Sequence, residues 1–132
     1  VLGADAVQIG SRFVASHECS AHINFKKEVV NIKEGETDLT LKELIGVRLI
    51  KNSFYNKIQQ AYANNATRKE LVDLLGRGRA KRGMFEGDLI DGELEIGQVS
   101  AMIDNILPVS QIFSQLVEEF NIASQIRGKL IL

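Results

Sequence analysis

The chain has 132 residues, of which 45% are hydrophobic and 25% are charged, and its formal net charge at pH 7 is −1. This is the composition of an ordinary globular protein of about one domain. The near-zero charge provides no overall field for nucleic acid or an anionic membrane. The single cysteine, Cys19, excludes an internal disulfide and fits a reducing compartment. No apolar run approaches the roughly 18 residues of a membrane span, and no signal peptide is visible, so we expect a cytoplasmic protein.

The first stretch combines a short apolar run with a glycine turn. Residues Ala6–Ile9 are rich in β-branched side chains and are followed by Gly10 and Ser11. They predict a short buried strand of the parallel-sheet kind, although periodicity alone also permits a helix. Residues 12–16 can then form one or two helical turns. Backbone N–H groups and the Ser11 hydroxyl at such a helix start suit a phosphate, but the same order is also typical of a simple βα turn.

Two amphipathic helices are predicted in the first half of the chain. Ser20 is a plausible N-cap for a helix over about residues 21–32. One face of this helix is apolar and carries Ala21, Phe25, Val29 and Ile32. A second helix is expected over about residues 53–63. Its inward residues are expected to be Phe54, Tyr55, Ile58, Ala61 and Tyr62.

Shorter elements surround these helices. Residues 39–41 and 46–50 are expected to be extended, although the first segment also allows a helical start. Thr67 and Glu70 have the spacing of a capping box, and this predicts a helix over Arg68–Leu75 that ends at Gly76.

A metal site is not expected near the two histidines. His17, Cys19 and His22 match no standard zinc spacing, and a fourth ligand is not evident. Likewise, Asp88 and Asp91 lack the other ligands of a calcium-binding EF-hand loop.

The basic segment 76–83 permits two interpretations. It holds four cations, Arg77, Arg79, Lys81 and Arg82. They could form an RNA-binding box or a phosphate clamp. The alternative is a solvated basic turn beside a helix C-terminus, where cations suit the helix dipole. We favour the turn and expect no nucleic-acid partner, because the segment has no aromatic residues for base stacking.

The last third is expected to be turn-rich over residues 84–92 and then helical. A helix over about residues 93–105 would carry Ile96, Val99, Met102, Ile103 and Ile106 on one side. Gly97 inside that helix would indicate a close backbone approach. Pro108 fits the first turn of a final helix. The apolar stripe of this helix, expected to be a packing face, consists of Val109, Ile112, Phe113, Leu116, Val117 and Phe120.

Residues Gly3–Phe13 resemble the last barrel strand of the FMN-dependent nitronate monooxygenase (2-nitropropane dioxygenase) and type II enoyl-acyl-carrier-protein reductase group. The family usually has Thr where this chain has Ser11, which keeps the hydroxyl. The resemblance continues through Ala21-His22, residues 48–52, and Gly87-Asp88 to Gly97-Gln98, and so covers nearly the whole chain.

The resemblance implies an α/β fold and a C-terminal fragment of a (β/α)₈ barrel flavoprotein. A whole barrel needs about 250 residues, and a start without Met, at residues 1–3 that read like a helix end, agrees with a fragment. Residues 1–32 would be the last strand and helix of the barrel, and residues 33–132 a C-terminal helical extension packing on it. The segment itself would be mostly helical with few short strands. Without neighbouring strands, residues 6–9 must pair with another copy or fragment, or stay irregular.

The implied activity is reduction of an enoyl-acyl-carrier-protein thioester, with hydride from NAD(P)H through FMN. The implied cofactor-binding residues are Gln8, Ile9, Gly10 and Ser11, largely through their backbone, together with Gln98. No catalytic residue is named, because the family's base lies upstream of residue 1. Nitronate oxidation is the alternative. The sequence 85–98, with its Gly-Asp, Gly-Glu and Gly-Gln pairs, favours the reductase.

Two further expectations concern partners. The basic segment would contribute to docking of the acidic acyl carrier protein through Arg77, Arg79, Lys81 and Arg82, and we expect a homodimer. A different class of interpretation is a small non-catalytic helical binding module that uses this basic segment. Flavin copurification would separate an enzyme from such a module.

Overall fold

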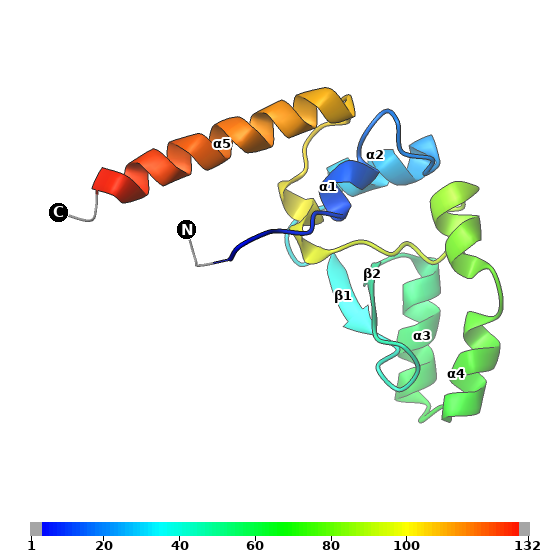
Figure 1. Ribbon diagram of the computed structural model, residues 1–132. Helices are drawn as coiled ribbons and strands as arrows, with labels where there is room; N and C mark the ends of the chain where they lie inside the picture. Colours follow the sequence, from blue (N-terminus) through cyan, green and yellow to red (C-terminus); the bar gives the residue numbers. More distant parts are fainter. Residues whose placement is uncertain (1–3, 130–132) are drawn as a thin grey trace.

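The computed structural model describes residues 4–129, which form a mostly helical chain with one two-stranded sheet (Figure 1). The expectation for residues 1–3 lies outside this range. In chain order the elements are α1 (Ser11–Val14), α2 (Ile23–Asn31), β1 (Thr37–Thr40), β2 (Val47–Ile50), α3 (Ser53–Ala63), α4 (Arg68–Leu75), the π-helical turn η1 (Lys81–Phe85), the 3₁₀ turn η2 (Gln98–Met102) and α5 (Val109–Lys129).

The sheet is an antiparallel hairpin of β1 and β2. Thr37 pairs with Ile50 at one end and Thr40 pairs with Val47 at the other. The two expected extended segments are therefore present, with the first shifted toward the N-terminus. The other edge of β2 receives residues 94–96. The N–H of Ile50 donates to Leu94 O at 3.0 Å, and the N–H of Ile96 donates to Arg48 O at 3.1 Å.

The predicted helix over residues 93–105 is wrong. Residues 93–96 are extended against β2, and only the five residues of η2 are helical. The reason is visible in the sequence Glu-Leu-Glu-Ile, which alternates polar and apolar residues with the period of a strand. Leu94 and Ile96 are buried in the core, whereas their neighbours Glu93 and Glu95 point to the other face. Gly97 consequently lies just before η2 instead of inside a helix.

Two hydrophobic clusters hold the fold together. The first brings α2 against β2, residues 94–96 and the segment after η2. Its buried members are Ala15, Phe25, Val29, Ile32, Ile50, Leu94, Ile96 and Ile103. The second lies between the hairpin, α3 and α4, and its buried members are Leu41, Leu49, Phe54, Ile58 and Leu71. The first cluster combines residues from both sides of the expected boundary at residue 32, and that boundary stays a prediction.

Local capping signals place α3 and α4 at their expected bounds. The Asn52 side chain accepts the N–H of Tyr55 at 2.9 Å and so caps α3. Thr67 and Glu70 form the expected capping box at the start of α4. The start predicted for α2 is wrong by two residues. His22, and not Ser20, is its N-cap, because Nδ1 of His22 accepts the N–H of Asn24 at 3.1 Å.

The N-terminal arm, residues 4–10, is irregular and exposed, so the predicted strand over residues 6–9 is absent in this chain. The reason is the one anticipated for an isolated segment: no strand of the described range, residues 4–129, pairs with the arm, and a single strand has no ladder to join.

Helix α5 extends from the body on the same side as the arm (Figure 1). The helix itself is confirmed, and Pro108 directly precedes it. Its expected packing face is only partly packed: Ile112 is 1% exposed, whereas Phe113 is 62% and Phe120 is 64% exposed. Across residues 4–129, no helix has the combination of length and apolarity needed to cross a membrane.

Candidate cofactor-binding groove

A groove of about 810 Å³ lies between the N-terminal arm, the segment that includes η2, and the first half of α5. Four of the five expected cofactor-binding residues, Gln8, Ile9, Gly10 and Ser11, line it. The opposite walls are formed by Val99, Met102, Ile103, Asp104, Asn105, Ile112, Gln115, Leu116, Glu118 and Glu119. The structure therefore brings the arm residues to one wall of an open cavity.

The Gly10–Ser11 turn is anchored by η2. The N–H of Gly97 donates to Ser11 Oγ at 3.1 Å, across 86 positions of sequence. A Cβ added at Gly97 would lie 2.7 Å from that oxygen. The close backbone approach expected at Gly97 is therefore present, although its cause is the contact with Ser11 and not packing inside a helix.

Arg12 fastens the other side of the turn. Its Nη2 donates to Asn105 Oδ1 at 2.6 Å, and its Nη1 donates to Asn105 O at 3.0 Å. These bonds link α1 to the chain between η2 and α5. The pair was not singled out from the sequence, because no local pattern relates two residues 93 positions apart.

The N-terminus of α5 is held beside α1 by backbone and side-chain bonds. The N–H of His17 donates to Leu107 O at 3.1 Å. The carboxylate of Glu18 accepts the N–H of Val109 at 3.0 and 3.1 Å, and it therefore satisfies a free donor at the helix start. The far wall of the groove is thus positioned by the loop that follows α1.

A buried lysine supports this loop. The ammonium of Lys26 donates to Ser16 O and Cys19 O, each at 2.6 Å, and the residue is 6% exposed. Carbonyl oxygens replace the water that a buried ammonium loses. Periodicity places Lys26 next to Phe25 at the edge of the apolar face of α2, but the sequence offers no signal for its carbonyl partners.

The donor set of the groove fits a phosphate at the Gly10–Ser11 end. Within residues 4–129, the N–H groups of Gly10 and Ser11 donate to no protein atom, and a Cβ at Gly10 would meet nothing within 4 Å. The far wall is different, because it carries the carboxylates of Asp104, Glu118 and Glu119. An anionic group would therefore lie on the arm side of the groove.

Gln98 is placed differently from the other expected cofactor-binding residues. It is exposed at the start of η2, and it is not among the residues that line the groove. Its role in cofactor binding stays a prediction. Within residues 4–129 there is also no group of three or more His, Cys, Asp or Glu side chains placed to hold a metal ion.

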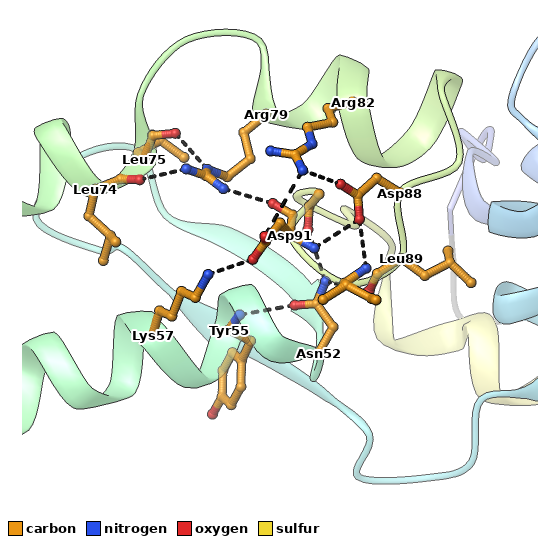
Figure 2. Close-up of polar contacts among 12 residues, drawn as sticks. Asn52, Tyr55, Lys57, Leu74, Leu75, Arg79, Arg82, Asp88, Leu89 and Asp91 are labelled. Carbon is orange, nitrogen blue, oxygen red and sulfur yellow. Dashed lines mark hydrogen bonds and ion pairs between the residues drawn. The ribbon is translucent and has the colours of Figure 1, made fainter.

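The basic segment is folded back onto α3 and α4 by internal bonds, as Figure 2 shows. Arg79 donates to Leu74 O and Leu75 O, at the C-terminus of α4, at 3.1 and 2.8 Å, and to Asp91 O at 2.8 Å. Its guanidinium also lies 4.3 Å from the centre of the Phe54 ring. The expected attraction between a cation and a helix C-terminus is present, but Arg79 is half-buried and not a solvated turn residue.

Acidic side chains organise the rest of this network (Figure 2). Asp88 accepts the N–H of Asp91 and of Ile90 and is 2.6 Å from Arg82 Nη2. The hydrogen bond from the Asp91 N–H holds the pKa of the Asp88 carboxyl below its ordinary value. Asp91 is 2.6 Å from Lys57 Nζ on α3, and this contact likewise lowers its pKa. These contacts fix the loop after η1 against α3.

Comparison with known proteins agrees with this arrangement. A family model described as nitronate monooxygenase matches residues 1–119. The solved structure of FabK from Thermotoga maritima is 35% identical, with a TM-score of 0.80, and the match covers 96% of this chain and 40% of that chain. A point mutant of the same FabK gives 34% identity, a TM-score of 0.77, and coverage of 96% of this chain and 38% of that chain.

The chain thus spans about two-fifths of the length of the FabK chains it matches. The expected fold, part of a barrel flavoprotein chain that is mostly helical with few short strands, is confirmed. The family model covers most of the chain, and the resemblance read from residues 3–13 onward is confirmed with it. The chain therefore belongs to the nitronate monooxygenase family, a family of FMN-dependent enzymes.

Proposed function

We propose that the chain forms part of an FMN-dependent enoyl-acyl-carrier-protein reductase. The observation that carries this proposal is the likeness to FabK along almost the whole chain. FMN, when bound, would take hydride from NAD(P)H and deliver it to the enoyl double bond, and the protein would supply binding and orientation. The described residues include no catalytic group that we assign.

In this function, the chain would contribute one wall of the site that binds the flavin phosphate. The N–H groups of Gly10 and Ser11 would donate to the phosphate, and the Ser11 hydroxyl is held in place by Gly97. Gln8 and Ile9 line the same wall of the groove. The contacts of Arg12 with Asn105 would keep this wall in register with the segment after η2.

The test is flavin affinity of a Gly10→Val variant of the whole enzyme. A Cβ at Gly10 would have no other atom within 4 Å, so the added side chain should obstruct the donors without unfolding the protein. A hydrogen bond to a charged group contributes about 1.5–3 kcal/mol, so we expect the Kd for FMN to rise about 10- to 100-fold. Gly46→Val, in the exposed hairpin loop, is the control. An unchanged Kd for Gly10→Val would refute the phosphate site.

Nitronate oxidation is the second candidate function. It is supported by the matching family model, which is described as nitronate monooxygenase. The two activities are separated by assaying the flavin-loaded enzyme with an enoyl thioester plus NAD(P)H and, separately, with a nitronate. Turnover of the nitronate alone would exclude the reductase.

Docking of the acyl carrier protein is a further part of this proposal, and the contacts refine how it is tested. Arg79 and Arg82 have internal partners, whereas Arg77 is exposed and Lys81 is an exposed residue 3.2 Å from Glu86. We therefore choose Arg77→Glu for the assay. It should raise KM a few-fold for an enoyl-carrier-protein substrate at low salt, and leave KM for a small enoyl thioester unchanged. Equal effects on both substrates would contradict docking.

A further inference from the structure

A second cavity, remote from the groove, lies between the hairpin loop, α4 and the extended segment after η1. Its volume is about 450 Å³. Its lining is mostly aliphatic, with three charged side chains, and consists of Leu41, Leu44, Ile45, Val47, Arg68, Val72, Leu75, Glu93 and Glu95. Neither the sequence analysis nor the proposed function uses this cavity.

The strand-like backbone of residues 93–96 places two carboxyl groups in the cavity. Leu94 and Ile96 are in the core, so the alternate residues, Glu93 and Glu95, lie on the cavity side. Glu93 is only 6% exposed. Within residues 4–129 its carboxyl group takes part in no hydrogen bond or ion pair, and its oxygens are not fully enclosed, so they are open to the cavity that Glu93 lines.

The neighbouring charges do not neutralise Glu93 directly. The charge of Arg79 is close enough to lower the pKa of Glu93, but the guanidinium donates its hydrogen bonds to three carbonyl oxygens and not to Glu93. Arg68 lies at the exposed rim and donates to Glu43 O at 3.2 Å. Burial raises the pKa of Glu93 to about 7, the charge of Glu95 adds to the rise, and Arg79 opposes it. The cavity therefore holds an acidic group that lacks a donor.

The walls of the cavity are open and apolar. Ile45 is 81% exposed and Val72 is 45% exposed, and both belong to the lining. A ligand with an aliphatic stem would cover these side chains. An ammonium at the end of that stem would bring three N–H donors and a positive charge to the carboxyl groups. We propose that this cavity binds a primary alkylammonium group, with its ammonium at Glu93 and Glu95 and its stem against the aliphatic walls.

This assignment has a specific pH dependence. An alkylammonium has a pKa near that of lysine, about 10.4, so it stays charged between pH 5.5 and 8.5, whereas Glu93 loses its proton within this range. A cation binds the ionised carboxyl, and its affinity should rise as the pH passes through about 7. A neutral ligand that accepts a hydrogen bond from the protonated carboxyl would show the opposite trend.

The experiment is calorimetric titration of the 132-residue chain with n-hexylammonium chloride and with hexanamide, at pH 5.5, 7.0 and 8.5. We expect the Kd of hexylammonium to fall about tenfold or more from pH 5.5 to 8.5. Hexanamide should bind more weakly than hexylammonium at pH 8.5, and its affinity should not rise with pH. A free amine and a lysine side chain carry the same ammonium group. A third titration uses Nα-acetyl-lysine N-methylamide, whose side-chain ammonium is free, and its Kd relative to that of hexylammonium distinguishes the two sources.

Variants test the placement. Glu93→Gln should remove the pH dependence and weaken hexylammonium binding at pH 8.5 about tenfold, whereas Glu86→Gln, at an exposed residue just after η1, should change neither. If Glu93→Gln does not fold, Val72→Trp at the mouth serves instead and should block the stem. Equal affinity at pH 5.5 and 8.5, equal binding of hexanamide, or no binding would overturn the proposal. The flavin groove is separate, so none of these results bears on the proposed reductase.

Discussion

Replacing Glu93 by Gln should change how the stability of the fold depends on pH. Glu93 is buried, and its pKa is raised from 4.5 to about 7, first by burial and then by Glu95. Between these pH values the folded protein binds more protons than the unfolded chain. Its free energy of unfolding must therefore fall as the pH rises from about 4.5 to about 7. Gln has the same shape and no titration, so the variant should lose this dependence.

The size of the effect follows from the same values. A difference of about 2.5 pH units, from 4.5 to about 7, corresponds to at most about 3 kcal/mol, because each unit corresponds to about 1.4 kcal/mol and water that reaches the carboxyl oxygens reduces the effect. This is a large part of the roughly 5–15 kcal/mol that stabilises a typical domain. Wild type and variant should therefore be similarly stable near pH 4.5. The variant should become more stable than wild type by as much as about 3 kcal/mol at pH 8.

Urea unfolding followed by circular dichroism at pH 4.5, 6 and 8 measures this difference. Carboxyls with lowered pKa values, such as Asp88 and Asp91, titrate in both proteins, so their contributions cancel in the comparison. Glu86→Gln is the matched control at an exposed position and should show no pH-dependent difference from wild type. A difference between the Glu93 variant and wild type that stays constant from pH 4.5 to 8 would refute the buried, unpaired carboxyl.

Two further predictions concern the stability of the fold. Thr67→Ala removes the N-cap of α4 and should lower the free energy of unfolding by about 1 kcal/mol, measured by urea unfolding; no loss would mean that the capping box contributes little. Gly92→Ala would push a Cβ into Asp88 O and the Cα of Gly83, and the thermal unfolding midpoint should drop well below that of Gly46→Ala, where a Cβ has its nearest neighbours at 3.9 Å. Equal midpoints for the two variants would contradict the tight packing at Gly92.

The sequence alone determined those elements that depend only on neighbouring residues, such as helix caps, helical periodicity and a glycine turn. The bounds of α3 and α4 were predicted from amphipathic periodicity and from the Thr67–Glu70 capping box, and the structure has the same bounds. The motif Gly10–Ser11 likewise led to the groove wall, because a glycine turn before a helix start leaves backbone donors free. These signals need no partner from elsewhere in the chain.

The tertiary structure alone decided what depends on distant partners. Residues 93–96 became extended because the edge of β2 was available to pair with them, and this placed Glu93 in a cavity. The same dependence left residues 6–9 irregular, because no described strand lies beside them. A strand needs a neighbour to satisfy its backbone hydrogen bonds, whereas a helix satisfies most of its own.

The fate of charged side chains was also beyond the sequence. Arg79 belongs to a segment that reads as a basic surface turn, yet it is half-buried with three carbonyl partners and the Phe54 ring. Lys26 is buried for a similar reason, because the loop after α1 turns its carbonyl oxygens toward the ammonium. Composition and periodicity report how many charges a chain carries. Only the three-dimensional arrangement of backbone oxygens decides which of those charges leave the solvent.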